Sequence, residues 1–453
     1  MRLFWIIILL FIINVSYSQD STIYLSLKEA RNYALENNIN IINARLDVLI
    51  SKNKVWETTA IGLPQVKGSA SYSNIFEVPV MNFGGYIDWA AMDPTVPLTS
   101  GMVLSNYVEG EPIELGTKEN IKWDVQVSQL IFSGEYIVGL QAAKVYKLLS
   151  ENNLEKNKLD VLEGVTQTYY LILMAEENNK ILEKSLENTL KIRDDMQATY
   201  NAGLIDKISI DQLNLTCKNL QNSLSNIKRQ IELSKKLLKV MLNIDVDQNI
   251  VLTDNLENIF NEIDYDALVN SNFDINNNID FQIMKVQQDL AKLSLRREKS
   301  AMLPTLSAYY IHQEQMNTPD FNFFNPNMVG VSLNWPLFTS FGRYSKIKQA
   351  KLSYEKAINT TNLVEKNLQV SFLQAKSDII TAYEKFQNEK ENLNLANSIY
   401  EQYLVKFKNG TASAIEMTQA QNQMLSTQAN YIAAMIELLN AKNKLDKVLN
   451  KYE

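Results

Sequence analysis

The feature that most constrains this fold is the stretch from residue 343 to 453, which contains no proline and only one glycine, Gly410. Before Gly410, apolar residues recur every seven positions, and a parallel series has Glu389 as its one break. The first series is Phe372, Ile379, Phe386, Leu393, Tyr400 and Phe407, and the second is Leu368, Ala375, Ala382, Ala396 and Tyr403. After Gly410 the apolar positions resume as Leu425, Ala429, Ile432, Ile436 and Leu439. This spacing predicts an antiparallel helical hairpin with coiled-coil periodicity and a turn at Gly410.

The length of this hairpin sets a further condition on the fold. At about 1.5 Å per residue, its first arm is about 100 Å long. A single hairpin of that length cannot bury its own apolar stripe, so we expect it to pack against partners.

The N-terminus has the pattern of a secretory signal peptide over residues 1–18. Arg2 supplies the positive start, Leu3 to Val15 form the apolar run, and Ser16 to Ser18 offer small residues for cleavage. We expect the mature chain to begin near Gln19. After residue 19 no stretch reaches about 18 consecutive apolar residues, which argues against a membrane-spanning helix.

Composition excludes several classes of protein. Nine prolines and fourteen glycines in 453 residues favour long helices. A formal net charge of −7 and the lack of a Lys/Arg-rich block argue against binding to nucleic acid. Cys217 is the only cysteine and His312 the only histidine. The sequence therefore predicts no disulfide framework, no metal site, no cofactor and no catalytic triad, and not an enzyme.

An internal repeat divides the chain. A helical pattern from Leu25 to Ala60 ends at Leu63-Pro64, and a similar one from Asp274 to Ala301 ends at Leu303-Pro304. Two later matches lie 206 and 207 positions apart. They pair Ile131-Phe132-Ser133 with Leu337-Phe338-Thr339, and Tyr200-x-x-Gly203 with Phe407-x-x-Gly410. We interpret the chain as two copies of one unit, in which a helix, two strands joined by a loop, and a helical hairpin follow one another.

Strict alternation of apolar and polar residues follows each Leu-Pro pair and recurs before each hairpin. The apolar positions are Val66, Ala70, Tyr72 and Phe76; Trp123, Val125 and Val127; Leu306, Ala308 and Tyr310; and Val329, Val331, Leu333 and Trp335. Such strands are typical of outer-membrane barrels, although a half-buried sheet in a soluble domain shows the same alternation. Two repeated strand pairs behind a signal peptide favour the membrane. Four strands cannot close a barrel, so the chain must then oligomerise through its strands.

The connections carry weaker signals. Residues 77–120, with four prolines, and residues 312–327 are expected to be surface loops that either narrow a pore mouth or simply cover it. Residues 243–262 are polar and acidic. We interpret them as part of a connector packed outside the helices, with an acidic metal loop as the alternative.

In this order, these segments resemble the TolC-like outer-membrane efflux protein family. The resemblance rests on Leu27-Lys28-Glu29-Ala30 with Ala34-Leu35-Glu36-Asn37-Asn38, on the junctions at Pro64 and Pro304, on Trp335-Pro336-Leu337-Phe338 before Gly342-Arg343, and on the two glycine turns. It implies an α+β membrane protein, a homotrimer whose twelve-stranded β-barrel takes four strands from each chain and continues into a tunnel of coiled-coil helices. It also implies an exit duct in the outer membrane that reaches into the periplasm and works with a periplasmic adaptor and an inner-membrane pump. The alternative is a soluble periplasmic coiled-coil adaptor or structural protein.

The domain organisation follows from the repeat. It comprises a signal peptide (1–18), an N-terminal helix (19–63), a first barrel hairpin with a long outer loop (64–133), a first helical hairpin (134–243), a connector (244–273), a repeat helix (274–303), a second barrel hairpin (304–339) and a second helical hairpin (340–453).

The resemblance places the functional residues at the helix tips. Acids that gate such ducts lie six and nine residues after the second tip glycine, which here are Glu416 and Gln419. At the first tip the matching residues are Tyr200, Gly203 and Asp211, which lies two positions later than the spacing at the second tip would place it. The family's locking tyrosine and arginine are replaced by Phe407 and Ala412 beside Gly410, so we expect another kind of lock. A solvated helix residue remains the alternative for Glu416.

Overall fold

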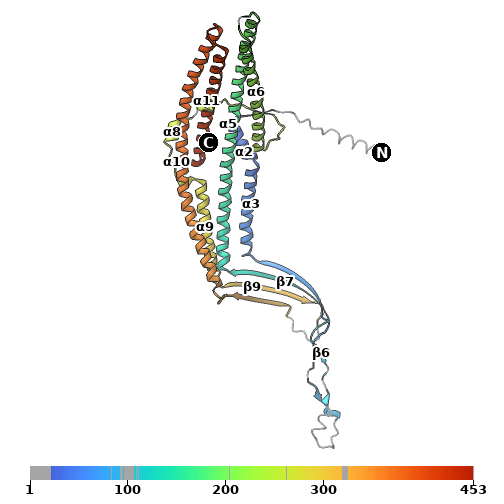
Figure 1. Cartoon of the computed structure of the whole chain (residues 1–453). Helices are drawn as coiled ribbons and strands as arrows, with labels where there is room; N and C mark the ends of the chain where they lie inside the picture. The colour runs from blue at the N-terminus through green and yellow to red at the C-terminus, as the bar shows by residue number, and fades with distance from the viewer. Residues whose placement is uncertain are drawn as a thin grey trace, which may run out of the picture. The chain divides into compact units, whose positions relative to one another are not determined.

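A computed structural model describes residues 22–451 except 83, 92–94, 96–106, 109, 111, 204, 262 and 319–324. The predicted signal peptide therefore lies outside the described residues. The chain divides into two compact units (Figure 1). The helical unit contains residues up to Ser51, Tyr146–Asp289 and Glu355–Glu453, and the strand unit contains Lys52–Val145 and Leu290–Tyr354. Within the described part of the chain, no helix is both long and apolar enough to cross a membrane.

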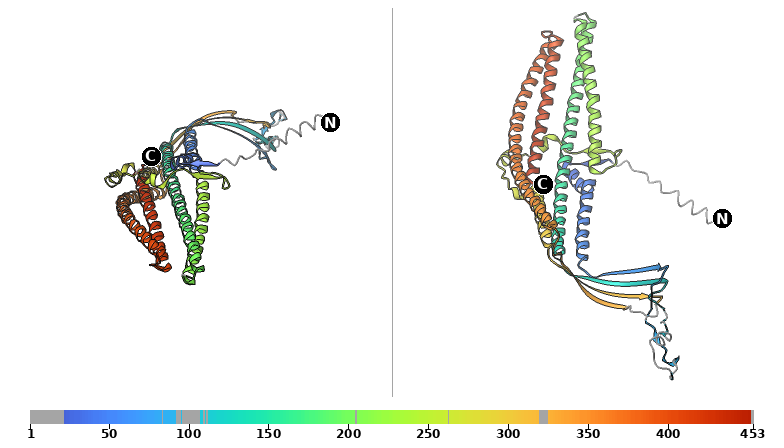
Figure 2. Two further views of the ribbon diagram at one scale, coloured as in Figure 1. Left: turned by 90° about the horizontal axis from the view of Figure 1, so that it is seen from above. Right: turned by 60° about the horizontal axis from the view of Figure 1, so that its bottom comes forward.

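The helices come in pairs of nearly equal length. They are α3 (Ile39–Ala60) and α9 (Ile279–Ser300), 22 residues each; α5 (Gly134–Asn201) and α10 (Gly342–Lys408), 68 and 67; and α6 (Lys207–Leu242) and α11 (Ala414–Leu449), 36 each. Shorter helices are α2 (Leu27–Asn37), α7 (Leu256–Asn261) and α8 (Tyr265–Val269). The hairpins α5/α6 and α10/α11 lie side by side in both sets of views (Figures 1 and 2).

The strand unit is built on one antiparallel sheet in the order β10-β9-β7-β2. Its strands are β2 (Gln65–Asn74), β7 (Glu119–Phe132), β9 (Thr305–Gln315) and β10 (Asn327–Asn334). The register pairs Val66 with Val127, Val127 with Tyr310, and Tyr310 with Val329. Partners across a ladder share a face, so the apolar positions of all four strands gather on one side. The outer strands are β2 and β10.

The long connection between β2 and β7 is more ordered than the sequence predicts. Instead of a plain surface loop, it contains two short antiparallel ladders. They join β3 (Val80–Asn82) to β6 (Pro112–Glu114) and β4 (Tyr86–Ile87) to β5 (Tyr107–Val108). Pro112 is accommodated because a two-stranded ladder has an outer edge that needs no donor. The second predicted loop is shorter than 312–327, since β9 continues through Gln315.

Two buried asparagines hold the starts of α3 and α9 in the same way. The side-chain amide of Asn38 donates to the carbonyl of Met241 at 2.6 Å, and that of Asn278 donates to the carbonyl of Val448 at 3.0 Å. Their side-chain oxygens accept the backbone N–H of Asn40 and of Asp280. Each asparagine thereby caps one helix and satisfies a terminal carbonyl of another, which fixes where the hairpin ends.

The connector packs against α10 through aromatic pairs. Tyr265 stacks on Tyr383 with ring centroids 3.9 Å apart, and Phe260 lies 4.3 Å from Phe386. Next to them, β8 (Ile250–Leu252) pairs in parallel with β1 (Ile23–Leu25). Burial of these rings stabilises the segment. These contacts pack this segment against α10.

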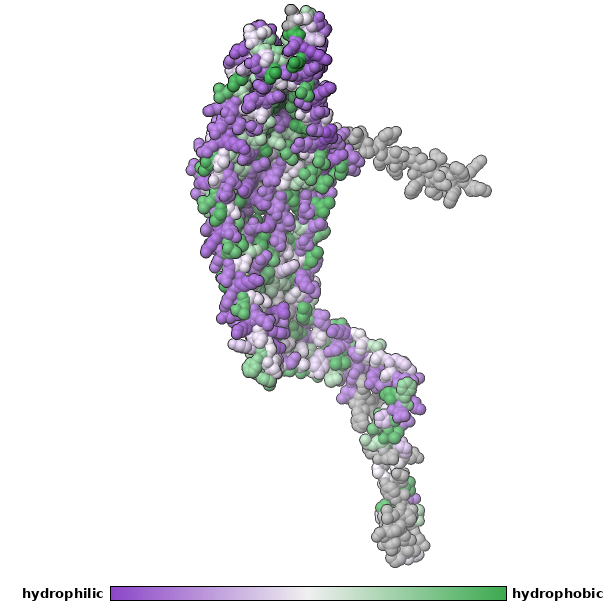
Figure 3. Space-filling model, viewed as in Figure 1, coloured by the Kyte–Doolittle hydropathy of each residue, from purple (hydrophilic) through white to green (hydrophobic). Residues whose placement is uncertain are grey.

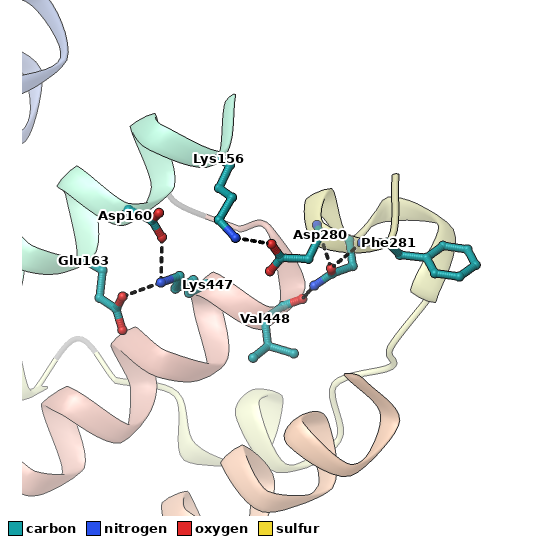
Figure 4. A network of polar contacts seen from close by, with 8 residues as sticks. Lys156, Asp160, Glu163, Asp280, Phe281, Lys447 and Val448 are labelled. Atoms are coloured by element: carbon teal, nitrogen blue, oxygen red, sulfur yellow. Dashed lines mark hydrogen bonds and ion pairs between the residues drawn. The ribbon is translucent and has the colours of Figure 1, made fainter. Parts of the chain in front are cut away.

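An ion-pair cluster fastens the end of α11 to α5 (Figure 4). The ammonium of Lys447 lies 2.7 Å from a carboxylate oxygen of Asp160 and 2.6 Å from one of Glu163. Burial alone would lower the pKa of Lys447, but its hydrogen bonds to both carboxylates outweigh burial and raise that pKa. Nearby, Lys156 of α5 pairs with Asp280 of α9.

The predicted heptad seam is buried on α10 but differs on α11. Ala375, Ile379 and Ala382 are almost fully buried. On α11, however, Ala429 is exposed, while Gln421 is 1% exposed. Ile432, Ile436 and Leu439 are buried as predicted, and the buried face of α11 extends beyond the predicted seam because this helix packs on α5 as well as on α10. The visible face of the helical unit is otherwise largely hydrophilic, with scattered hydrophobic residues (Figure 3).

Candidate functional site at the hairpin tips

The first tip joins α5 to α6 through a glycine turn. Gly203 has φ +76°, a conformation that residues with a Cβ rarely adopt, and its N–H donates to the carbonyl of Tyr200 at 2.8 Å. Asp206 then caps α6, accepting the backbone N–H of Ser209 at 3.0 Å and its hydroxyl at 2.7 Å. These two hydrogen bonds lower the pKa of Asp206.

The second tip has the same construction. Gly410 has φ +70°, and its N–H donates to the carbonyl of Phe407 at 3.0 Å. Ser413, three residues after the glycine as Asp206 is at the first tip, caps α11. The Ser413 backbone N–H and hydroxyl both donate to Glu416, at 2.7 and 2.9 Å, and the N–H of Glu416 donates back to the Ser413 hydroxyl at 3.3 Å. This is a capping box.

Glu416 is therefore a structural cap as well as an exposed acid. The hydrogen bonds from the backbone and side chain of Ser413 lower the pKa of Glu416, so it is ionised at neutral pH. Asp211 and Gln419 are also exposed. No described hydrogen bond or ion pair joins Asp211 to Glu416 or Gln419, so within one chain these three side chains do not form a cluster. The pattern Ser-x-x-Glu was visible in the sequence but was not used to predict the cap.

An apolar cluster, which we call the tip cluster, joins the two hairpins. Its buried members come from all four long helices of the hairpins: Ile192, Leu213, Phe407, Ala414 and Met417. Phe407 is 7% exposed, and Ala412 is half-buried beside it. Burial of a phenylalanine ring contributes about 1.5–3 kcal/mol. Within this chain, the hairpin tips are thus held by apolar packing at Phe407 and Ala412.

A buried polar contact lies next to this cluster. The side-chain amide of Gln421 on α11 donates to the hydroxyls of Ser185 and Thr189 on α5, at 3.0 and 2.7 Å. All three side chains are buried. Sequence reasoning missed these residues, because a glutamine inside a hydrophobic seam has no local pattern that marks it as buried.

A groove of about 690 Å³ runs between the hairpins close to the tip cluster. Its charged lining residues are Lys184, Lys191, Asp195, Glu401 and Lys408, and its apolar ones include Ile181, Tyr400 and Met424. Tyr400 is buried enough for desolvation to raise the pKa of its hydroxyl. The groove lining thus combines apolar and charged side chains, as sites for another protein segment commonly do.

The remaining sequence-predicted residues lie elsewhere. Pro64 and Pro304 directly precede β2 and β9, and Pro336 lies between β10 and α10. His312, on β9, is in contact with Trp123, with ring centroids 5.5 Å apart. Cys217 is buried on α6, and this burial raises the pKa of its thiol, which disfavours the reactive thiolate.

Comparison with known proteins finds similarity in sequence and in fold. The family model described as outer membrane efflux protein matches residues 274–451. Among curated proteins, the "Toxin and drug export protein A" of Aggregatibacter actinomycetemcomitans is 22% identical over 309 residues. That match covers 64% of this chain and 64% of the relative, so it extends over somewhat less than two thirds of the relative's length.

Solved channel structures share the fold over nearly the whole chain. The Campylobacter jejuni CmeC outer membrane channel is 17% identical, with a TM-score of 0.73, and the match covers 94% of this chain and 86% of that one. The open-state MtrE outer membrane channel of Neisseria gonorrhoeae is 13% identical, with a TM-score of 0.72 over 94% and 88% of the two chains. At these identities the likeness establishes the fold.

Proposed function

We propose that the whole chain is an exit duct in the outer membrane for efflux or export, since residues 274–451 match the family model described as outer membrane efflux protein. The observation that carries this proposal is the four-stranded sheet in which the alternating apolar positions predicted from the sequence lie on one face, as Val66, Val127, Tyr310 and Val329 do. That face is suited to lipid, and the polar face is suited to a water-filled lumen. The relative that exports toxins and drugs supports the same class of activity.

We propose that the duct is a homotrimer closed through β2 and β10. Four strands are too few for a barrel, since closed barrels need about eight or more. The outer strands β2 and β10 belong to an antiparallel sheet with an even number of strands, so β10 of one copy meets β2 of the next in antiparallel orientation. Three copies form a ring of twelve strands in which no edge is left open to lipid.

The helical unit gains partners in the same assembly. Leu363, Val370, Leu373 and Leu395 on α10 are each about 60% exposed in the single chain. In a trimer, the two equivalent hairpins of each chain form the wall of a tunnel and cover these side chains. The duplicated unit accounts for the matched lengths of the paired helices.

We further propose that the tips meet a periplasmic adaptor and an inner-membrane pump, with Glu416, Gln419 and Asp211 lining the periplasmic entrance. Rings of acids at a narrow point attract cations. The glycine turns with Tyr200, Gly203, Phe407, Gly410 and Ala412 form the end that the adaptor contacts. We also propose the division of the chain into signal peptide, barrel hairpins, connector and helical hairpins, with the residue ranges predicted from the sequence.

Membrane fractionation tests the duct against a soluble periplasmic coiled-coil protein. We expect the chain to sediment with outer membranes and to need detergent for extraction. Val331→Lys places a charge on the apolar face of β10, whereas Ser332→Lys changes the neighbouring residue on the polar face. We expect the first to lower the membrane-bound amount and the second to be tolerated, because a lysine facing the middle of the bilayer costs about 2–4 kcal/mol. Recovery of the wild-type chain in the soluble periplasmic extract would exclude the duct.

A further inference from the structure

A charged pocket of about 370 Å³ lies within the strand unit, where α9 ends and α10 begins. Its lining residues are Glu135, Arg297, Glu298, Ala301, Thr339, Gly342, Arg343 and Lys346. The pocket holds three cationic side chains and two carboxylates, so cations are in excess. None of these residues belongs to the tip site.

The three cationic side chains of this pocket differ in their hydrogen-bond and ion-pair partners. Arg343 donates to the carbonyl of Ala301 and thereby ties the start of α10 to the end of α9. Arg297 pairs through Nε with Glu135 at 3.2 Å, and its guanidinium has further N–H donors on the two terminal nitrogens. Lys346 is exposed and makes no ion pair with any described residue. Arg297 and Lys346 are therefore the two groups able to receive an added anion.

Large apolar side chains lie exposed in the segment that leads into the pocket. Leu337, Phe338 and Phe341 are 78%, 76% and 74% exposed, and the two phenylalanine rings meet edge to face with centroids 6.2 Å apart. Ser340 and Phe341 both have positive φ, +47° and +63°, although neither is glycine. Such strained conformations persist where the surrounding structure imposes them. Here the exposed ring of Phe341 directly precedes Gly342 and Arg343, two lining residues of the pocket.

We infer that this pocket binds the headgroup of an anionic glycerophospholipid while Phe338 and Phe341 contact its acyl chains. A guanidinium and an ammonium together suit a phosphodiester, and exposed apolar rings beside the pocket suit acyl chains. The carboxylate of Glu298 can accept hydrogen bonds from headgroup hydroxyls, which phosphatidylglycerol has and phosphatidylcholine lacks. This inference rests on the proposed placement in a membrane.

Lipid binding by the full chain, purified in neutral detergent, tests the inference. Native mass spectrometry is recorded with added phosphatidylglycerol, with phosphatidylcholine, and with inorganic phosphate as a competitor. We expect phosphatidylglycerol to bind on the order of 10-fold more tightly than phosphatidylcholine, which corresponds to loss of one charge-assisted contact. Inorganic phosphate should compete only weakly, because it lacks acyl chains.

Two pairs of substitutions make the test specific. Arg297→Gln with Lys346→Gln should abolish the preference for phosphatidylglycerol. Arg296→Gln with Lys348→Gln removes the same charge from the same helices outside the pocket and should keep it. Equal binding of both lipids by the wild type, equal behaviour of the two variants, or full displacement by phosphate would overturn the inference. Membrane fractionation of the same variants separates this failure from failure of the duct, since both should still sediment with outer membranes.

Discussion

The side-chain amide of Gln421 donates to the hydroxyl of Thr189 across the interface between α11 and α5, at 2.7 Å, and both side chains are buried. The two residues are 232 positions apart and belong to different hairpins. In a contact formed mainly by apolar side chains, a buried hydrogen bond is satisfied in only one register. This pair therefore sets how the second hairpin is aligned along the first.

Replacement of Gln421 by leucine should loosen the alignment of the two hairpins while leaving the stability of the chain nearly unchanged. Thr189 and Ser185 keep other contacts, since the Thr189 hydroxyl already donates to the Ser185 carbonyl at 2.8 Å. We expect Gln421→Leu to change the free energy of unfolding by less than about 1 kcal/mol, because the lost hydrogen bonds are offset by apolar burial. Amide hydrogen exchange over residues 181–192 should nevertheless become faster. Unchanged exchange would show that apolar packing alone sets the register.

Phe407 should carry most of the stability of the tip. Truncation of a buried phenylalanine costs about 3–5 kcal/mol, so Phe407→Ala should release the tip cluster and raise hydrogen exchange around Leu213 and Met417. Val405→Ala is the matched control, because Val405 is 58% exposed on the same helix, and surface changes cost within about 0.5 kcal/mol. If amide hydrogen exchange around Leu213 and Met417 were equally fast in both variants, the tips would not be held by this cluster.

Two substitutions at Glu416 separate its role in capping α11 from the effect of its charge on ion selectivity. Glu416→Gln keeps a side chain that can complete the capping box, whereas Glu416→Ala removes it. We expect both to weaken cation preference in single-channel recordings, but only the alanine variant to speed hydrogen exchange at the start of α11. Unchanged selectivity in both variants would remove Glu416 from the pore.

The capping contribution of Glu416 should depend on pH in a defined direction. The pKa of Glu416 is lowered in the folded chain, so its stabilisation is complete above its ordinary pKa and is lost as pH falls through the lowered value. The difference in exchange between wild type and Glu416→Ala should thus be largest at neutral pH and shrink in acid below about pH 4, where only the hydrogen bonds that an uncharged side chain can accept remain. An equally large difference in acid would mean that the ionised carboxylate is not what caps α11. Glu391→Ala, on the exposed side of α10, provides the control.

Lys447 should matter more than an ordinary surface lysine. Lys447→Gln removes the ammonium that bridges Asp160 and Glu163, and because all three side chains are partly exposed we expect a loss of only about 1 kcal/mol. Lys236→Gln breaks an exposed pair within one helix turn and should cost less than about 0.5 kcal/mol. Chemical denaturation measures both. A larger effect at Lys236 would contradict the role given to Lys447.

The long helices, the glycine turns and the strand faces were predictable because each depends on local spacing. The seven-residue repeat identified Ile379 and Phe386 as buried, and alternation placed Val66 and Val329 on a common face. Gln421 and Ala429 were not predictable, since burial on α11 depends on α5, which lies far away in the sequence. The sequence marks Phe407 and Ala412 as a departure from the family's tip residues, but only the three-dimensional packing shows that they join an apolar cluster.

The central claim, closure of three chains through β2 and β10, is tested most directly by disulfide trapping in isolated outer membranes. In a Cys217→Ser background, Ser69→Cys on the polar face of β2 is combined in turn with substitutions at the polar-face positions of β10 (Met328→Cys, Gly330→Cys, Ser332→Cys and Asn334→Cys). We predict that at least one register gives disulfide-linked dimers and trimers on a denaturing gel, with a closed trimer as the largest species. Monomers alone at every register, or a ladder that continues beyond three chains, would contradict the account.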